Sequence, residues 1–247
     1  MNTAVAFEPM SPRTQARIAG FLYLLIILGG LFAPFAIAPS GMMLGEAALP
    51  TAGKILASKP LYVLGGVAQL VVYASDTGVA LIFYELFKPV SRTLALLATF
   101  FRLVFVAVAS ANMFNHFVPL IFLSGADYLK GFKPDQLQAL ALASLRLRVF
   151  GFDIALVFFG FHCLVVGYLL FESGFFPRIL GLGLAIGGVG YLSNILSTAI
   201  PSAIRVHLFP YIMLPAGLAE ISLTLWLITV GVNVPRWRER AGLSTQN

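Results

Sequence analysis

The chain has 247 residues, of which 59 % are hydrophobic and 11 % are Asp, Glu, Lys or Arg. A soluble domain carries about 25 % charged residues, so this composition excludes an ordinary soluble domain. The mean hydropathy of +0.92 indicates a membrane protein instead. The net charge of +6 does not indicate nucleic-acid binding, because the basic residues lie between apolar stretches, where they mark topology and contact lipid headgroups.

We predict an all-α fold, a polytopic transmembrane bundle of about six helices. Each apolar stretch approaches the ~20 residues that a helix needs to cross a bilayer. The predicted spans, in chain order, cover about residues 18–38, 61–87, 94–123, 149–172, 178–200 and 210–233. They form one domain, 18–233, between tails at 1–17 and 234–247.

The first predicted span, residues 18–38, begins like a secretory signal peptide. Arg13 and Arg17 precede the apolar stretch, and small residues at 36–38 resemble a cleavage site. The stretch is longer than the apolar region of a signal peptide, and Pro39 would directly follow the cleavage point. We therefore expect an uncleaved helix.

The second and third predicted spans form an antiparallel hairpin. Pro89 ends the second span, and only the letters KPVSRT separate it from the third. Farther along, Asp135 and Gln138 have capping-box spacing, so a helix is predicted to begin there and to form an amphipathic outer extension before the fourth span. Gly174 suits the end of the fourth span, and Pro177 suits the first turn of the next helix.

An even number of spans places both termini on one side of the membrane. The short segments on the side of the termini carry their Arg and Lys residues next to the helix ends. Lys and Arg are enriched in short cytoplasmic segments close to the ends of membrane helices. We therefore expect a multi-pass protein of the bacterial cytoplasmic (inner) membrane with both termini in the cytoplasm.

The hairpin carries one acid and one base where a bilayer disfavours both. A charge in the hydrocarbon core costs between ~3 and 17 kcal/mol, depending on the method. Asp76 lies ~18 Å from Lys88 along its helix and Arg102 ~15 Å from Arg92, so both fall near mid-membrane. Matched depth on adjacent helices predicts an ion pair. Two interpretations stay open: an ion, proton or substrate site, or a buried pair that fixes helix register.

Two further ionisable residues lie at similar depth, His162 in the fourth span and Glu220 in the sixth. His162 is either a packing residue or a proton carrier. Glu220 either relays protons or donates one hydrogen bond between helices. The candidate polar layer therefore consists of Asp76, Arg102, His162 and Glu220, with Gln69, Tyr73, Tyr191 and Asn194 as secondary members.

The fifth span is rich in glycine. Its letters GLGLAIGGVG resemble a nucleotide-binding loop, but such a loop follows a strand and lies in water. Small residues at helical spacing instead let membrane helices approach closely. One stripe contains Gly183, Gly187, Gly190, Asn194 and Ser197. We expect it to serve helix packing, and self-association of two copies through Gly183, Gly187 and Gly190 is a second use of the same stripe.

No cofactor or metal is predicted. The single cysteine, Cys163, excludes an intramolecular disulfide and a Cys-rich zinc site. The sequence has no HExxH motif and no histidine pair at helical spacing. It also has no serine–histidine or paired-aspartate motif, so we expect no enzymatic activity. Membrane lipids are the expected partners.

Five stretches carry a resemblance to a known family. They are RIAGFLYLL (17–25), FYELFKPVSRTLALLATFFRLV (83–104), FGFDIALVFFGFHCLVVGYLLFESGFFPRILG (150–181), GYLSNIL (190–196) and AEISLTLWLITVGV (219–232). The chain resembles a family of bacterial multi-pass membrane proteins that is catalogued only as a domain of unknown function. The resemblance implies an integral-membrane helical bundle and supplies no activity or ligand.

Three functions compete. The first is a structural or accessory inner-membrane protein whose polar residues fix helix packing. The second is a small transporter or proton-coupled carrier that uses the polar layer as a relay, although the two halves of the chain show no convincing inverted repeat. The third is an intramembrane enzyme acting on lipid, which the missing catalytic motifs disfavour.

Overall fold

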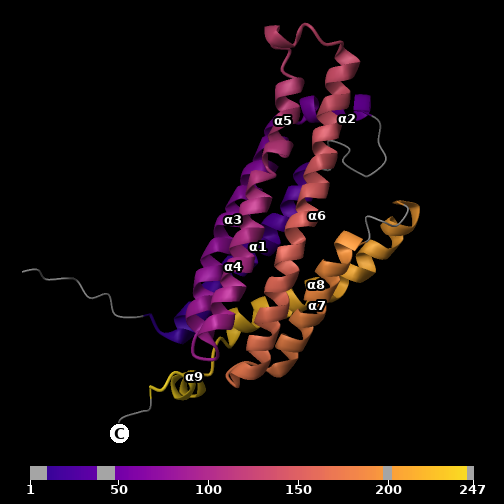
Figure 1. Cartoon of the computed structure of the whole chain (residues 1–247). Helices are drawn as coiled ribbons and strands as arrows, with labels where there is room; N and C mark the ends of the chain where they lie inside the picture. Colours follow the sequence, from indigo (N-terminus) through magenta and orange to yellow (C-terminus); the bar gives the residue numbers. More distant parts are fainter. Residues whose placement is uncertain (1–9, 38–47, 197–201, 244–247) are drawn as a thin grey trace, which may run out of the picture.

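The computed structural model describes residues 10–37, 48–196 and 202–243, and the long elements within them are all helices (Figure 1). Their bounds are α1 Pro12–Ile37, α2 Ala48–Ala57, α3 Lys59–Phe87, α4 Arg92–Ala111, α5 Phe114–Phe122, η2 Asp127–Leu129, α6 Pro134–Ser173, α7 Arg178–Leu196, α8 Ser202–Thr229 and α9 Val234–Arg240. The fold is therefore all-α. The predicted ends of the first span at residue 38 and of the fifth at 197–200 lie outside the described residues.

Several of these helices are long and apolar enough to cross a membrane. Among the described residues, five stretches meet this criterion: Pro12–Phe32, Lys59–Phe87, Arg92–Phe122, Pro134–Ser173 and Arg178–Leu196. A sixth is added if Met213–Thr229 and Val234–Arg240, which are bent by 100° at a short break, count as one span. The chain is a helical multi-pass membrane protein.

The third predicted span, 94–123, contains a break at which α4 ends and α5 begins. Asn112 lies in this break, and its side chain makes hydrogen bonds to residues of α5 and α6. Its Nδ2 donates to the backbone oxygen of Arg148 on α6 at 2.6 Å, and its Oδ1 accepts from Asn115 at 2.9 Å. The break thus provides a polar contact between α4, α5 and α6.

Helix α6 is a single rod of 40 residues, or about 60 Å at 1.5 Å per residue. It exceeds the 40–45 Å that a bilayer measures including its headgroups, so part of it projects beyond the membrane. The predicted capping pair at its start is wrong. The helix begins at Pro134, and Gln136, not Gln138, accepts from the Lys133 backbone N–H at 2.9 Å. It ends at Gly174, whose φ of +73° is left-handed and favours glycine.

The long helices form a closed ring in chain order. Each packs against two others, in the pairs α1–α3, α3–α4, α4–α6, α6–α7, α7–α8 and α8–α1. Figure 1 shows α7 and α8 running obliquely to α6, where they complete the ring. The apolar core lies inside this ring and draws residues from every one of these helices, including Tyr23, Phe83, Phe105, Phe159, Leu184 and Leu223. Side chains that point into the ring from different helices at the same depth are therefore able to contact one another.

Glycines on α7 allow the ring to close tightly. A Cβ at Gly181 would lie 2.5 Å from the backbone oxygen of Gly167 on α6, and one at Gly187 would lie 2.8 Å from the Cα of Ala216 on α8. Of the predicted stripe, Gly183 and Gly187 therefore face α8 within the same chain. Ser197 lies outside the described residues. Self-association through the stripe stays a prediction.

Candidate functional site

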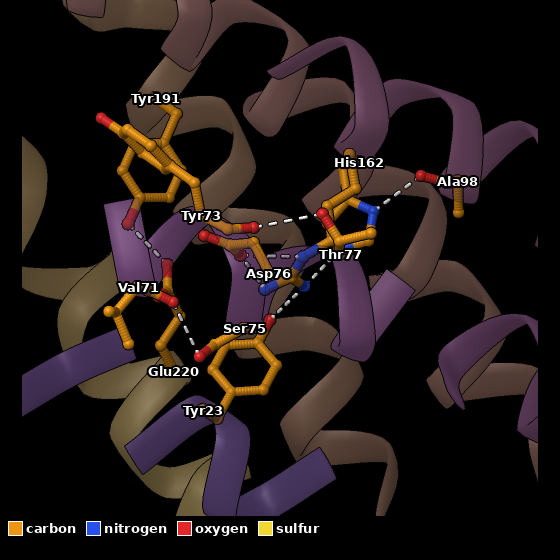
Figure 2. A network of polar contacts seen from close by, with 11 residues as sticks. Tyr23, Val71, Tyr73, Ser75, Asp76, Thr77, Ala98, His162, Tyr191 and Glu220 are labelled. Atoms are coloured by element: carbon orange, nitrogen blue, oxygen red, sulfur yellow. Dashed lines mark hydrogen bonds and ion pairs between the residues drawn. The ribbon is translucent and has the colours of Figure 1, made fainter. Parts of the chain in front are cut away.

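One polar side chain from each helix of the ring lies in a common layer (Figure 2). Measured along each helix from its end nearest the chain termini, all of them lie about 14–20 Å deep at 1.5 Å per residue. The layer consists of Tyr23 on α1, Asp76 on α3, Arg102 on α4, His162 on α6, Tyr191 on α7 and Glu220 on α8. That depth is close to the middle of a ~30 Å hydrocarbon slab.

Arg102 and Asp76 form a buried ion pair. The guanidinium donates to Asp76 Oδ1 from Nε at 3.0 Å and from Nη2 at 2.5 Å. Arg102 is 0 % exposed and Asp76 2 % exposed. The short α3–α4 turn places the two residues side by side, so each charge neutralises the other where neither has water. This contact is the one that matched depth predicts.

Arg102 also binds two neutral side chains, one on α1 and one on α6. Its Nη1 donates to the Tyr23 hydroxyl at 2.9 Å and to His162 Nε2 at 3.0 Å. Figure 2 shows both of these side chains near Asp76, the ion-pair partner of Arg102. Aromatic rings add a cation–π environment, because the guanidinium carbon lies 4.8 Å from the Tyr23 ring centre and 5.5 Å from that of Phe159. One side chain on α4 thus contacts α1, α3 and α6.

The hydrogen bonds of His162 define its protonation state. Its Nδ1 lies 2.8 Å from the backbone oxygen of Ala98, which can only accept, so Nδ1 carries a hydrogen. Its Nε2 faces an N–H of Arg102, so Nε2 accepts. His162 is therefore a neutral imidazole with both nitrogens engaged.

Glu220 and Tyr191 form a separate pair within the layer. The Tyr191 hydroxyl donates to Glu220 Oε1 at 2.5 Å, between α7 and α8. Both side chains are half-buried. The ring of Phe159 links the pair to the Arg102 cluster, because it packs edge-on against Tyr191 at 5.2 Å and lies parallel to His162 at 5.6 Å. The predicted layer thus comprises two hydrogen-bonded groups with an aromatic ring between them.

The secondary residues lie apart from the Arg102 cluster. Asn194 on α7 donates to Asp153 on α6 at 2.8 Å, and both are buried. Tyr73 is buried on α3 and packs edge-on against Phe105, while Gln69 is half-buried one turn away. Among the described residues, no three His, Cys, Asp or Glu side chains are grouped as metal ligands.

A second polar cluster, which the sequence analysis missed, lies toward the opposite end of the bundle. The rings of Tyr62 on α3 and His116 on α5 stack at 4.2 Å. Tyr62 donates its hydroxyl to the His116 backbone oxygen at 2.5 Å, and His116 Nε2 lies 3.2 Å from the Tyr62 backbone oxygen. Gly66 makes room, since a Cβ there would lie 2.7 Å from the imidazole. The sequence signal was a tyrosine and a histidine at equal distance from the hairpin turn.

Comparison with known proteins assigns the chain to a family. The model of the family described as "Domain of unknown function (DUF4386)" matches residues 18–231. The chain belongs to this family. The residues of the polar layer all lie within the part that matches the DUF4386 model.

One relative is an uncharacterised protein of Archaeoglobus fulgidus. It is 23 % identical over 178 residues, which cover 72 % of this chain and 89 % of the archaeal protein. No solved structure matches the chain significantly. Neither the DUF4386 description nor this relative supplies an activity, so function is argued from the site alone.

Proposed function

We propose that the chain is a structural or accessory protein of the bacterial cytoplasmic membrane, without enzymatic activity, whose polar layer holds the helices of the ring in register. The observation that carries the proposal is the environment of Arg102. From α4 it makes hydrogen bonds to α1, α3 and α6 while none of its surface is exposed. Its hydrogen bonds connect α4 to its neighbours α3 and α6 and also to α1, which is not next to α4 in the ring.

The energetics favour a packing role for this cation. Removing one partner of a buried ion pair costs roughly 3–5 kcal/mol, because the remaining charge is left unpaired. Removal of Arg102 would also take away the hydrogen-bond donor that faces Tyr23 and His162. Arg102 has no exposed surface at this depth, and the neutral His162 has no nitrogen left to accept a proton without breaking a bond.

The proposal predicts strong coupling between Asp76 and Arg102. We expect Asp76→Asn and Arg102→Gln each to lower the free energy of unfolding by about 3–5 kcal/mol. The double variant should lose clearly less than the sum of the two, because it leaves no uncompensated charge. The measurement is reversible unfolding in mixed micelles. The control is Glu85→Gln with Lys88→Gln, an exposed ion pair at the end of the same hairpin, which should cost less than about 1 kcal/mol.

A proton-coupled carrier is the second candidate, and Glu220 is the observation that favours it. This carboxyl is only half-buried, and its hydrogen bond to Tyr191 is separate from the Arg102 cluster. Proteoliposomes that enclose a pH-sensitive dye separate the two functions. The structural proposal predicts the same slow proton leak for wild type, Glu220→Gln and Asp76→Asn. A flux in wild type that disappears in variants of normal stability would establish the carrier and refute the structural role.

A further inference from the structure

A groove with a volume of about 540 Å³ lies at the end of the bundle where α1 begins and where α6 and α8 end. We call it the terminal groove. Arg13 lines it from α1, residues 174–177 line it from the α6–α7 turn, and Trp226 with residues 230–236 lines it from the end of α8 and the turn into α9. These segments come together at the lower end of the molecule, beside α9 (Figure 1).

We infer from the surrounding helix ends that the terminal groove lies at the level of the lipid headgroups. Arg13 follows the first residue of α1, Gly174 follows the last residue of α6, and Gly231 lies just after the last residue of α8. Helix ends that coincide at one face of a membrane bundle mark the boundary between hydrocarbon and headgroups. Trp226 lies in the wall of the groove, and tryptophan is enriched at this boundary.

The charge of the groove comes from two arginines, and among the residues that the structure describes no acidic side chain lines it. Arg13 and Arg236 are both exposed. In the described part of the chain, neither arginine lies within ion-pair distance of a carboxylate. Arg236 Nη1 donates to the Gly174 backbone oxygen at 3.0 Å, which fixes the guanidinium at the rim. Each guanidinium has five N–H groups, so most of these donors are available to an anion.

The wall between the two arginines is apolar. The indole N–H of Trp226 donates to the Gly231 backbone oxygen at 3.0 Å, so the polar edge of this side chain is already satisfied. The exposed Val230 continues the apolar surface, and Phe175 and Phe176, which are mostly buried, also line the groove. A soluble phosphate would satisfy the arginines and leave this surface uncovered. A phospholipid supplies a phosphate for the arginines and a glycerol with upper acyl carbons for the wall.

We propose that the terminal groove binds the headgroup of an anionic phospholipid from the leaflet that it faces. The phosphodiester oxygens accept hydrogen bonds from Arg13 and Arg236, and the start of an acyl chain lies against Trp226. Basic pockets between membrane helices bind anionic headgroups in this way. A zwitterionic lipid binds less well, because its choline group adds a third cation to the site.

Trp226 allows a direct test, because the chain has only two tryptophans. The full chain with Trp237→Phe is placed in phosphatidylcholine nanodiscs with increasing fractions of brominated phosphatidylglycerol, or of brominated phosphatidylcholine, as quenchers. We expect phosphatidylglycerol to quench Trp226 at a roughly tenfold lower mole fraction. Arg13→Gln with Arg236→Gln should abolish this preference. Arg17→Gln with Arg238→Gln, two exposed arginines that do not line the groove, should retain it.

Each remaining outcome decides the matter. Equal quenching by the two lipids, or an unchanged preference in the Arg13/Arg236 variant, overturns the proposal. Loss of the preference in inorganic phosphate, but not in sodium chloride of equal ionic strength, assigns the groove to a soluble anion instead. If loss of the Gly174 bond prevents the double variant from folding, Arg13→Gln alone must weaken the preference and Arg13→Lys must keep it.

Discussion

At the scale of single residues, the buried histidines His162 and His116 are opposite tautomers. His162 has its hydrogen on Nδ1, which faces the Ala98 carbonyl, and its Nε2 accepts from Arg102. His116 must carry its hydrogen on Nε2, because that atom faces the Tyr62 carbonyl. The neighbouring backbone therefore sets which nitrogen of each ring is able to accept a proton.

This difference is measurable by ¹⁵N NMR of histidine-labelled protein. In a His207→Gln background, the two remaining histidines should give one Nδ1–H and one Nε2–H neutral tautomer. His162→Gln should remove the first set of signals and His116→Gln the second. Two identical tautomers, or an imidazolium at either position at neutral pH, would show that the hydrogen-bond assignment is wrong.

At the scale of helices, α6 and α7 approach each other through backbone rather than side chains. Gly181 packs against Gly167, and Gly188 packs against Gly160, so closely that a Cβ on any of them would lie 2.5–3.0 Å from the backbone oxygen of its partner. Packing is a main source of helix association in a membrane, because lipid supplies no hydrophobic driving force between helices. These glycines therefore set the distance between α6 and α7, and with it the position of His162 relative to Tyr191.

Adding one methyl group should reveal this close approach. In Gly181→Ala the new Cβ would lie 2.5 Å from a backbone oxygen, so the helices must separate, at a cost of about 1–3 kcal/mol in unfolding free energy. Gly217→Ala on α8 has no heavy atom within 4 Å of its Cβ, and should be neutral or stabilise by up to about 1 kcal/mol. Equal effects of the two substitutions on unfolding would contradict the close packing of α6 and α7.

At the scale of the whole molecule, the ring brings the start of α1 and the end of α8 to the same face, where α9 packs. Trp237 on α9 donates to the Leu86 backbone oxygen at 2.9 Å, and Arg240 donates to that of Glu172. The two ends of the described chain therefore share one side of the bundle. This arrangement agrees with an even number of crossings.

Impermeant maleimide labelling of single cysteines tests the crossings and their direction. Lys130→Cys should react in intact spheroplasts, whereas Ser11→Cys and Glu239→Cys should react only after permeabilisation. The native Cys163 is fully buried and should stay unlabelled in all samples. Opposite accessibility of positions 11 and 239 would mean an odd number of crossings, and exposure of both in intact spheroplasts would invert the predicted orientation.

The sequence could predict how deep in the membrane the ionisable residues of this site lie. Counting residues from the helix ends places Asp76 and Arg102 at one level, and a short turn makes their helices neighbours, which is enough to pair them. Tyr23 could not be found in this way, because one tyrosine in an apolar stretch has no distinguishing pattern. Its contact depends on α1 and α4 both packing against α3, which brings their side chains together inside the ring.

Two other features depend on neighbours that hydropathy does not specify. The pairing of Tyr191 with Glu220 requires that α7 and α8 face each other with their midpoints aligned. The break between α4 and α5 lies in a stretch apolar enough to be predicted as one span, and the polar residues Ser110, Asn112 and Asn115 around it do not by themselves predict a break. The break is explained by a contact with α6, where the Arg148 backbone oxygen accepts a hydrogen bond from the Asn112 side chain.

The 26-residue separation of Asp76 and Arg102 has a consequence for how the protein is made. A ribosome adds about 5–20 residues per second, so the base follows the acid within about 1–5 s. Tyr23 has been synthesised before either of them, and His162 arrives 60 residues after Arg102. This short interval would allow the acid and the base to enter the membrane together as one neutral hairpin, beside a first helix that already offers a hydroxyl. Neither charge would then have to face lipid alone.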